Sequence, residues 1–565
     1  MKRVLILVGL LVAASLAQAQ DVAGDWQGTL NAGGAELRLV LHITKAADGS
    51  LKAVLDSIDQ PGANGIPVKS ATLKDSKLNL DVDLIKGTYE AKVAADTKTI
   101  SGTWTQNEQS FPLEFKRGAP PAKTEHKPAK PSDIDGTWMG TLDLGAAKLR
   151  VVFHIVNSED GLTATLDSPD QGAKGIPTTS VTRDGASLKI EVKSIGGIFD
   201  GKIAADLSTI DGTFTQLGSA HPLVLKRVKE QAELELKRPQ NPVKPYPYHD
   251  EEVSYDNKAQ NVTLAATLTV PQGKGPFPAV VLITGSGPQD RDESLMGHKP
   301  FLVLSDYLTR HGIAVLRADD RGTAKSTGTF AGATTADFAT DTEAAIAYLK
   351  TRPEVDPHKI GLVGHSEGGD IAPMIAARNK DVAFIVMMAG TGVPGDQILV
   401  AQGEAIEVAS GKDPQVAAKD AAKERELLIL VETEKDDAML EKELREKLAG
   451  EVPEAQIEAQ IKEITSPWFR YFLTYDPAIA LRKVTCPVLV LNGEKDKQVL
   501  PSQNLPPIRK ALEEAGNKHV EIDELPGLNH LFKTAKTGAV SEYAEIEETM
   551  SPVVLEKIAT WILKQ

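Results

Sequence analysis

The chain has 565 residues, of which 41% are hydrophobic and 25% are charged, and its formal net charge at pH 7 is −15. This composition is ordinary for a globular protein, but the length exceeds what one hydrophobic core serves, so we expect several domains. The negative charge argues against nucleic acid and anionic membrane surfaces as partners, because both repel an acidic protein.

Residues 1–19 have the pattern of a signal peptide. A basic start precedes the apolar run Val4–Leu16, and Ala17-Gln18-Ala19 matches a cleavage site. The run is too short to span a bilayer comfortably and no later stretch does better, so we predict no membrane span. Because no cysteine follows the cleavage site, we do not expect a lipid anchor. We predict export to the periplasm or the extracellular space, where the single Cys486 still has no internal disulfide partner.

Residues 20–117 and 133–227 are two copies of one module. For example, Asp25-Trp-Gln-Gly-Thr-Leu30 recurs as Thr137-Trp-Met-Gly-Thr-Leu142. The spacing is far longer than that of a solenoid repeat, so these are tandem domains. Short runs of alternating apolar and polar residues, separated by glycine-containing turns, predict antiparallel β meanders that form a small barrel or sandwich.

One histidine occupies the same strand position in each module. His42 lies in the first copy and His154 in the second. The pair could belong to a ligand site, and the modules could then recognise a glycan, the cell wall or another protein. Alternatively, each histidine faces solvent or satisfies its hydrogen bonds within the module, and this structural interpretation is the favoured one.

Two proline-rich connectors, residues 118–132 and 228–247, separate the modules from each other and from the C-terminal region. From residue 248 to 565, continuous apolar strands alternate with helices, which predicts a mostly parallel sheet covered on both faces. Residues of about 396–475 interrupt this alternation with helical sequence. Ligands bind at the carboxyl ends of such strands, so we interpret the insertion as a helical cap over that edge.

The stretch Lys359–Gly369 predicts a strand, an abrupt turn and a helix that begins near Asp370. Within it, Gly364, Ser366 and Gly368 form the pattern G-x-S-x-G. In a nucleophile elbow the serine takes a strained conformation that exposes its hydroxyl, and the backbones on both sides approach too closely for a Cβ atom. We therefore predict Ser366 as a nucleophile.

A serine nucleophile needs a histidine base, and the base needs a carboxylate that fixes its tautomer. After an elbow serine, the acid and then the base follow along the chain. We predict Asp496 as the acid, in the loop after the strand Pro487–Leu491, with Glu494 as the alternative. Only His519 and His530 follow. His519 has strand neighbours, whereas His530 lies in a later loop, so we predict His530 as the base.

The tetrahedral intermediate of acyl transfer needs two preorganised donors. We predict the backbone N–H of Glu367, at the start of the helix, and the backbone N–H of Ser286, in the glycine-rich loop Thr284–Pro288. Such a loop could instead bind phosphate, but neither a Walker lysine nor a dinucleotide-binding glycine pattern is present. No clustered Cys/His pattern indicates a metal, and we expect no cofactor.

Three aromatic residues at the end of the predicted cap, Trp468, Phe469 and Phe472, are candidates for the wall of a substrate pocket. They could equally anchor the cap to the core. The charged run Asp290-Arg-Asp292 could bind a charged substrate group, but an ion-paired loop that braces the oxyanion donor is the favoured interpretation.

The segments that carry a resemblance are Gly285-Ser-Gly-Pro-Gln-Asp-Arg-Asp-Glu293, Gly297-His-Lys-Pro-Phe301, Asp319-Asp-Arg-Gly322 with Ser326-Thr-Gly328, Gly364-His-Ser-Glu-Gly-Gly369, Ser466-Pro-Trp-Phe469 and Leu491-Asn-Gly-Glu-Lys-Asp496. Together they resemble a family of bacterial α/β-hydrolases, described as esterases or serine aminopeptidase-like hydrolases, over about residues 248–565. The resemblance implies the same triad, Ser366, Asp496 and His530. It departs at Thr323-Ala324, where the family usually has a second glycine, and it does not cover the β modules.

The predicted fold class is two tandem all-β modules followed by an α/β-hydrolase domain with a helical cap insertion. The predicted function is that of an exported serine hydrolase that cleaves small carboxylic esters with short acyl chains. Two alternatives stay open. One is a peptidase that acts at an amino terminus, with Glu367 or cap carboxylates binding the ammonium group. The other is a binding or adaptor protein led by the β modules.

Overall fold

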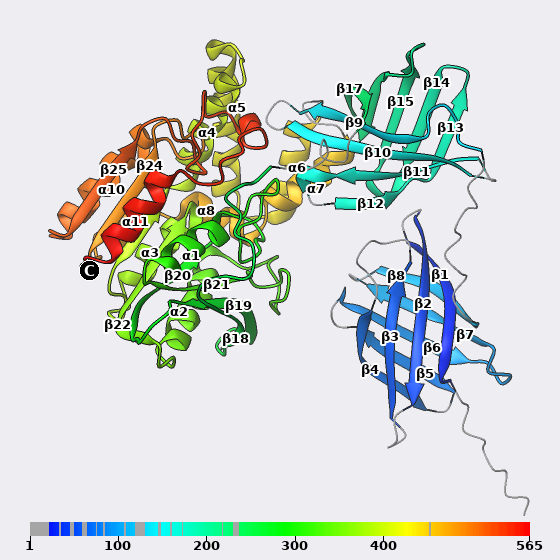
Figure 1. The fold of residues 1–565 in the computed structure, drawn as a ribbon, viewed down its shortest axis with the longest axis horizontal. Helices are drawn as coiled ribbons and strands as arrows, with labels where there is room; N and C mark the ends of the chain where they lie inside the picture. The colour runs from blue at the N-terminus through cyan, green and yellow to red at the C-terminus, as the bar shows by residue number, and fades with distance from the viewer. Residues whose placement is uncertain are drawn as a thin grey trace, which may run out of the picture.

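The structure is a computed structural model that describes residues 22–32, 35–45, 50–58, 65–74, 76–82, 85–106, 109–118, 130–144, 148–158, 161–171, 173–216, 218–229, 237–450 and 454–565. The predicted signal peptide, residues 1–19, lies outside these ranges. Figure 1 shows two β modules and a larger α/β domain, which confirms the predicted fold class. Within the described residues, no helix combines the length and the apolar character that crossing a membrane requires.

Module 1 is a closed barrel in which each strand pairs with the next and β8 pairs with β1. Alternate residues point into the barrel and form its hydrophobic core. The strands are β1 (Gly24–Ala32), β2 (Ala35–Lys45), β3 (Leu51–Ser57), β4 (Ile66–Lys74), β5 (Lys77–Val82), β6 (Gly87–Val93), β7 (Thr99–Gln106) and β8 (Gln109–Arg117).

Module 2 repeats this meander as a nine-stranded sheet whose end strands are β12 and β13. These two short strands correspond to the single strand β4 of module 1. In module 2 this strand is interrupted at Thr178 and Thr179. The Thr178 hydroxyl donates a hydrogen bond to the carbonyl of Ala164 at 2.7 Å, beside the backbone N–H of Thr178, which donates to the same carbonyl at 3.2 Å. The elements are β9 (Gly136–Asp143), β10 (Lys148–Ser158), β11 (Gly161–Ser168), η2 (Pro169–Gln171), β12 (Ala173–Pro177), β13 (Ser180–Asp184), β14 (Ser187–Val192), η3 (Lys193–Ile195), β15 (Gly197–Ile203), β16 (Thr209–Gln216) and β17 (Ser219–Arg227).

The tryptophan that opens each module explains why that motif recurs. Trp26 and Trp138 are fully buried, and each indole N–H donates to a backbone carbonyl four residues earlier at 2.9 Å. A guanidinium group covers each ring, Arg117 at 4.4 Å and Arg227 at 4.5 Å from the ring centroid. The last strand of each module is thereby tied to the first.

The C-terminal domain contains an eight-stranded sheet in the order β18-β19-β21-β20-β22-β23-β24-β25. The first three strands in this order pair antiparallel, and the strands from β21 to β25 run parallel. The strands are β18 (His249–Asn257), β19 (Val262–Val270), β20 (Phe277–Ile283), β21 (Ala314–Ala318), β22 (Val355–His365), β23 (Ile385–Met388), β24 (Val488–Gly493) and β25 (Val520–Leu525).

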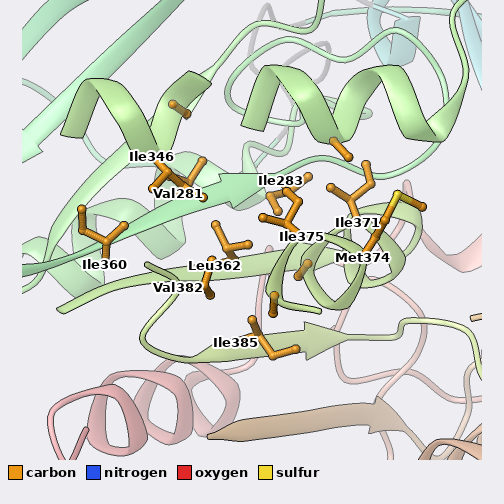
Figure 2. Packing of buried hydrophobic residues seen from close by; sticks show 14 of the residues in the cluster. Val281, Ile283, Ile346, Ile360, Leu362, Ile371, Met374, Ile375, Val382 and Ile385 are labelled. Carbon is orange, nitrogen blue, oxygen red and sulfur yellow. The ribbon is translucent and has the colours of Figure 1, made fainter. Parts of the chain in front are cut away.

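Helices cover both faces of this sheet. Side chains of α1 and α11 pack on one face, and those of α2, α3 and α10 pack on the other. Figure 2 shows the second of these layers, where Ile371 and Ile375 of α3 meet Ile283 of β20 and Leu362 of β22. The helices are α1 (Pro300–Arg310), α2 (Thr335–Leu349), α3 (Glu367–Ala376), α9 (Ala478–Leu481), α10 (Pro501–Glu514), η5 (Val540–Glu542) and α11 (Pro552–Ile562).

The helical insertion between β23 and β24 has a hydrophobic core of its own, which includes Leu428, Leu440 and Ile457. Its helices are α4 (Gly395–Ala409), α5 (Pro414–Thr433), α6 (Asp437–Leu448), α7 (Glu454–Ile464) and α8 (Pro467–Thr474). Because the insertion leaves the sheet at the carboxyl end of β23, it covers the edge where ligands bind in such sheets.

Module 2 lies beside the cap helices α6 and α7 in Figure 1. Gln456 of α7 donates a hydrogen bond to the hydroxyl of Ser219 at 3.3 Å. Lys148 forms an ion pair with Glu545 of the C-terminal domain at 3.1 Å. Module 2 therefore contacts both the helical cap and the part of the C-terminal domain that lies outside the cap.

Candidate functional site

Ser366 lies in the turn between β22 and α3, with φ of 53° and ψ of −117°. Residues other than glycine rarely adopt a positive φ, so this conformation is held by its surroundings. A Cβ atom at Gly364 would lie 1.9 Å from the carbonyl oxygen of Gly368, and one at Gly368 would lie 2.2 Å from the carbonyl oxygen of Ile283. The G-x-S-x-G pattern thus reflects two backbone contacts that only glycine permits.

The helix after the turn begins at Glu367, three residues earlier than we predicted. Two successive glycines, Gly368 and Gly369, disfavour a helix in isolation, which is why the sequence pattern pointed to Asp370. In the fold these glycines let the first helical turn pack against Ile283 and Gly390, and that packing overrides their low helix propensity.

His530 and Asp496 form a buried pair at this edge of the sheet. The Nδ1 atom of His530 lies 2.9 Å from Oδ2 of Asp496, and the two side chains are 5% and 0% exposed. The other carboxylate oxygen of Asp496 accepts hydrogen bonds from the backbone N–H groups of Gln498 and Val499 at 2.8 and 2.9 Å. The carboxylate is thereby fixed, and it can orient the imidazole ring.

The two alternative residues lie elsewhere. Glu494 accepts a hydrogen bond from the backbone of Gly527 at 2.8 Å in an exposed position, and it does not contact His530. His519 is exposed and precedes β25 rather than lying within it. The geometry therefore brings together the pair that we preferred and leaves both alternatives apart from it.

Ser366 and His530 line the same cavity, which has a volume of about 310 Å³. In the described part of the chain the Ser366 hydroxyl forms no hydrogen bond with the imidazole ring. Hydrogen bonds between a nucleophile and its base are often long without substrate and tighten only in the reactive complex. The two groups are thus juxtaposed across a shared space.

The two expected oxyanion donors, Ser286 and Glu367, also line this cavity. Neither backbone N–H has a hydrogen-bond partner among the residues that the structure describes. By contrast, the N–H of Gly285 donates to Oε1 of Glu293 at 2.9 Å and so is not available to an oxyanion. This bond distinguishes Ser286 from its neighbour in the glycine-rich loop.

The charged run after this loop, Asp290-Arg-Asp292, forms ion pairs with residues of the same domain, as the structural interpretation expected. Arg291 is bidentate to Asp319, with distances of 2.9 and 2.7 Å, and Arg317 binds Asp292 at 2.9 Å. Both arginine side chains are buried. The run therefore braces the oxyanion loop against β21 and the loop that follows it.

Trp468 and Phe472 of α8 form one wall of the cavity. Their rings stack with centroids 5.4 Å apart and planes 4° from parallel. Phe469, the third residue that we expected there, does not line the cavity and packs instead on the hydrophobic core of the cap. Residues one position apart on a helix point in directions about 100° apart, so α8 cannot turn all three rings to one side.

Three acidic residues, Glu293, Glu367 and Asp370, line the cavity. Glu367 accepts hydrogen bonds from the Thr335 hydroxyl at 2.6 Å and from the Trp468 indole N–H at 2.9 Å. Burial raises its pKa above the ordinary value. Burial likewise raises the pKa of Asp370, one turn further along α3, to about 7. Among the described residues the cavity lining contains no lysine or arginine.

The described residues contain no group of three or more His, Cys, Asp or Glu side chains arranged to hold a metal ion. Cys486 is a free thiol, and burial raises its pKa to about 11, so little thiolate is present at neutral pH. The cavity lining offers hydroxyl, imidazole and carboxylate groups.

The structure also reveals two participants that we did not assign from the sequence. Glu293 is buried and contacts both Gly285 and His365. His365, directly before the serine, lies 3.1 Å from the backbone carbonyl of His530. No spacing rule links these positions. The sequence signals are that a histidine precedes the nucleophile and that both residues lie in segments that resemble the hydrolase family.

Comparison with known proteins gives matches in the same region. A family model described as X-Pro dipeptidyl-peptidase (S15 family) matches residues 260–521, a range that contains Ser366 and Asp496 but ends before His530. Esterase EstD from Thermotoga maritima is 26% identical over 312 residues, which covers 55% of this chain and 68% of the relative. An uncharacterized 31.7 kDa protein from Escherichia coli is 27% identical over 244 residues, covering 42% and 80%.

Solved structures that are similar to this chain include the following two. A hypothetical protein from Pseudomonas aeruginosa is 16% identical with a TM-score of 0.37, and the match covers 60% of this chain and 98% of that one. The esterase Pf2001 of Pyrococcus furiosus is 15% identical with a TM-score of 0.34, covering 56% and 93%.

Proposed function

Because the C-terminal domain belongs to the α/β-hydrolase family and is a serine hydrolase of the carboxylesterase type, we propose that this protein is an exported esterase that cleaves small carboxylic esters. The observation that carries the proposal is the buried pair of His530 and Asp496 facing the cavity of Ser366. We propose Ser366 as the nucleophile, His530 as the base and Asp496 as the residue that orients the base.

In the proposed mechanism, the Ser366 hydroxyl attacks the ester carbonyl carbon while His530 takes its proton. The negative oxygen of the tetrahedral intermediate receives hydrogen bonds from the backbone N–H groups of Ser286 and Glu367. His530 then donates the proton to the departing alcohol, which leaves an acyl group on Ser366. Water, deprotonated by His530, attacks this acyl-enzyme and releases the acid, so serine is restored.

The cavity dimensions favour short acyl chains. Its volume of about 310 Å³ lies at the lower end of the range for small-molecule sites. The stacked rings of Trp468 and Phe472 form a wall that an extended chain would have to displace. The buried carboxyl groups of the lining and the absence of lysine and arginine from it disfavour substrates with a second negative charge.

A second candidate is hydrolysis at the amino terminus of a peptide. Two observations favour it: the match to a peptidase family model over residues 260–521, and the carboxyl groups of Glu367 and Asp370 in the cavity lining. An ammonium group could be neutralised there, whereas a neutral ester needs no such partner.

Fluorophosphonate labelling of the purified mature protein tests the serine hydrolase proposal. We expect one labelled residue, Ser366, and no labelling of Ser366→Ala, whose turnover should fall by about 10⁶-fold. Full activity of that variant would eliminate both enzyme candidates. Rates on p-nitrophenyl acetate and on aminoacyl p-nitroanilides then separate the two, because an esterase cleaves the first and an amino-terminal peptidase prefers the second.

The roles of the β modules and of the N-terminal segment are separate proposals. We propose domain limits of 20–117, 133–227 and 248–565, with residues 1–19 removed on export. Mass spectrometry of the exported protein would show the new N-terminus. If the modules lead a binding function, deletion of residues 21–227 should abolish binding to a glycan, cell wall or protein ligand while ester turnover persists.

A further inference from the structure

A second histidine–carboxylate pair lies beside the proposed triad. The Nδ1 atom of His365 lies 2.9 Å from Oε1 of Glu293, and its Nε2 atom lies 3.1 Å from the carbonyl oxygen of His530. The rings of His365 and His530 are 5.0 Å apart between centroids. The side chains of His365 and Glu293 are 8% and 9% exposed. Nothing in the proposed mechanism uses this pair.

The protonation state of His365 can be inferred from the oxygen atoms that contact its two ring nitrogens. Both ring nitrogens face oxygen atoms, but a neutral imidazole has only one N–H to donate. The missing proton could belong to Glu293, yet the same Oε1 atom already accepts the N–H of Gly285 at 2.9 Å. An imidazolium at His365 and a carboxylate at Glu293 satisfy all three contacts at once, and the two charges compensate each other.

The groups around His365 are consistent with this state. Glu293 faces it from the loop before α1, and the charge of Asp496 acts on it from the loop after β24. His530 and Phe532 pack against it from the loop after β25. Although burial acts to lower the pKa of His365, Glu293 raises it above its ordinary value.

This pair connects three loops of the proposed site. Gly285 directly precedes the oxyanion donor Ser286, His365 directly precedes Ser366, and the carbonyl that His365 holds belongs to His530 itself. One chain of hydrogen bonds thus runs from the oxyanion loop through Glu293 and His365 to the base. The two links made by His365 are buried, and the link between Gly285 and Glu293 is partly buried.

We infer that His365 and Glu293 are positioning residues, and that the buried imidazolium–carboxylate pair holds the oxyanion loop and the catalytic histidine in register with the nucleophile. This inference rests on the proposed roles of Ser366 and His530. In this state the doubly protonated ring donates to both neighbours. Loss of that proton at alkaline pH releases the carbonyl of His530 or the carboxylate of Glu293.

The test uses the full mature chain with Glu293→Gln, His365→Asn and the matched controls Glu494→Gln and His519→Asn, which are exposed. We expect both site variants to lower kcat/KM for p-nitrophenyl acetate by about tenfold to a hundredfold, as a displacement of about 1 Å does. The controls should change it less than twofold. Fluorophosphonate labelling of Ser366 should slow in parallel in the site variants.

The pH profile separates positioning from a merely structural role. In the native protein kcat/KM should decline at alkaline pH as His365 loses its proton. In Glu293→Gln the pKa of His365 falls without its carboxylate, so this alkaline decline should begin at least one pH unit lower. An unchanged kcat/KM and pH profile in folded Glu293→Gln would overturn the inference.

Nitrogen NMR of ¹⁵N-histidine-labelled protein reads the proton count directly, with His365→Asn assigning the signal. Two protonated ring nitrogens at pH 7 are expected, and a single one would overturn the inference. If His365→Asn does not fold, the shift of the same signal in Glu293→Gln supplies the assignment. Failure of the proposed function is distinguishable, because it would appear as full activity of Ser366→Ala.

Discussion

Histidine–carboxylate pairs occur in the β modules as well as in the catalytic domain. In module 1, His42 lies 2.7 Å from Asp25 and 3.2 Å from Asp56, and in module 2, His154 lies 2.9 Å from Asp167. These distances match that of the His530 pair, but both module histidines are 33% exposed, whereas His530 is 5% exposed. The contact is therefore the same and only its surroundings differ.

The difference shows what turns such a pair into a reactive site. In each module the aspartate also holds a turn, because Asp56 accepts the N–H of Gly65 and Asp167 accepts that of Gly175, both at 2.6 Å. These pairs tie a strand to a loop. In the catalytic domain the pair of His530 and Asp496 is buried and lies at the cavity that Ser366 lines. An electrostatic interaction is stronger in such buried surroundings than in water.

The largest expected effect comes from the buried pair. Asp496→Asn should lower turnover of a short ester by about 10⁴-fold, because the amide no longer accepts the Nδ1 proton and favours the wrong imidazole tautomer. Rates at pH 7 on folded protein measure the effect. Glu494→Gln, in the same loop but exposed, should change the rate less than twofold. A larger loss in Glu494→Gln than in Asp496→Asn would reverse our assignment of the acid.

The next effect concerns the cavity wall, a feature that the module pairs lack. Trp468→Ala removes a stacked ring and the donor to Glu367, so longer acyl chains should fit. We expect kcat/KM for a hexanoyl ester relative to an acetyl ester to rise by about tenfold to a hundredfold, the range for one or two methylene groups. Trp468→Phe retains a ring and should keep the short-chain preference. An unchanged ratio in Trp468→Ala would show that the wall does not limit chain length.

A smaller effect concerns the pH dependence of stability. It should distinguish the buried carboxyl group of Asp370 from the partly exposed carboxyl groups of the modules. Asp370 has a pKa of about 7, so the folded protein binds its proton more tightly than the unfolded chain does. Stability from this group is therefore greatest below about pH 4 and is lost as pH rises toward 7, with a slope of up to about 1.4 kcal/mol per pH unit.

Asp370→Asn should reduce this slope for the catalytic domain, because an amide oxygen can still accept the two bonds from Thr391. Denaturant unfolding at several pH values between 4 and 7 provides the measurement. Burial raises the pKa of Asp320 to about 8, so this residue should still contribute to the pH dependence of stability in the variant. A slope equal to that of the native protein would count against a buried, protonated Asp370.

The smallest effect is expected in module 1. Burial acts to lower the pKa of His42, but Asp25 and Asp56 raise it above the ordinary value. The contribution to stability is therefore present below the ordinary pKa of histidine and is lost as pH rises through the folded value. His42→Asn should cost less than about 1 kcal/mol, because the pair is partly exposed.

Ester turnover of His42→Asn should equal that of the native protein. Thermal unfolding at pH 5.5 and pH 8 should show a difference from the native protein only at the lower pH. Asp25→Thr is the matched variant, since Thr137 occupies this position in module 2 and contacts His154 at 3.1 Å. A loss of ester turnover in either variant would contradict our conclusion that the His42 pair of module 1, unlike the His530 pair, has no part in catalysis.

Local patterns were sufficient for much of the catalytic domain. The run before Ser366 is a strand because its residues are apolar on both faces. The preference for His530 over His519 and for Asp496 over Glu494 followed from where loops leave a parallel sheet. These features depend on neighbours along the chain and on general rules of the fold.

Other features depended on contacts between distant segments. Gly368 and Gly369 became helical because the helix packs closely on β20, and Phe469 turned away from the cavity because the cap has its own core. In module 2 the interruption of one strand lies at Thr178, whose hydroxyl and backbone N–H both donate to Ala164 on the neighbouring strand.

The sequence by itself determined the repeats, the alternation of strands and helices, and the order of the proposed nucleophile, acid and base along the chain, because each is recorded in local spacing. Only the tertiary structure decided that Glu293 and His365, 72 positions apart, meet and share their protons with the base loop. The physical reason is that burial and hydrogen-bond partners are properties of the folded surroundings. A histidine beside an aspartate has the same chemistry in all three domains until the fold excludes water from one of them.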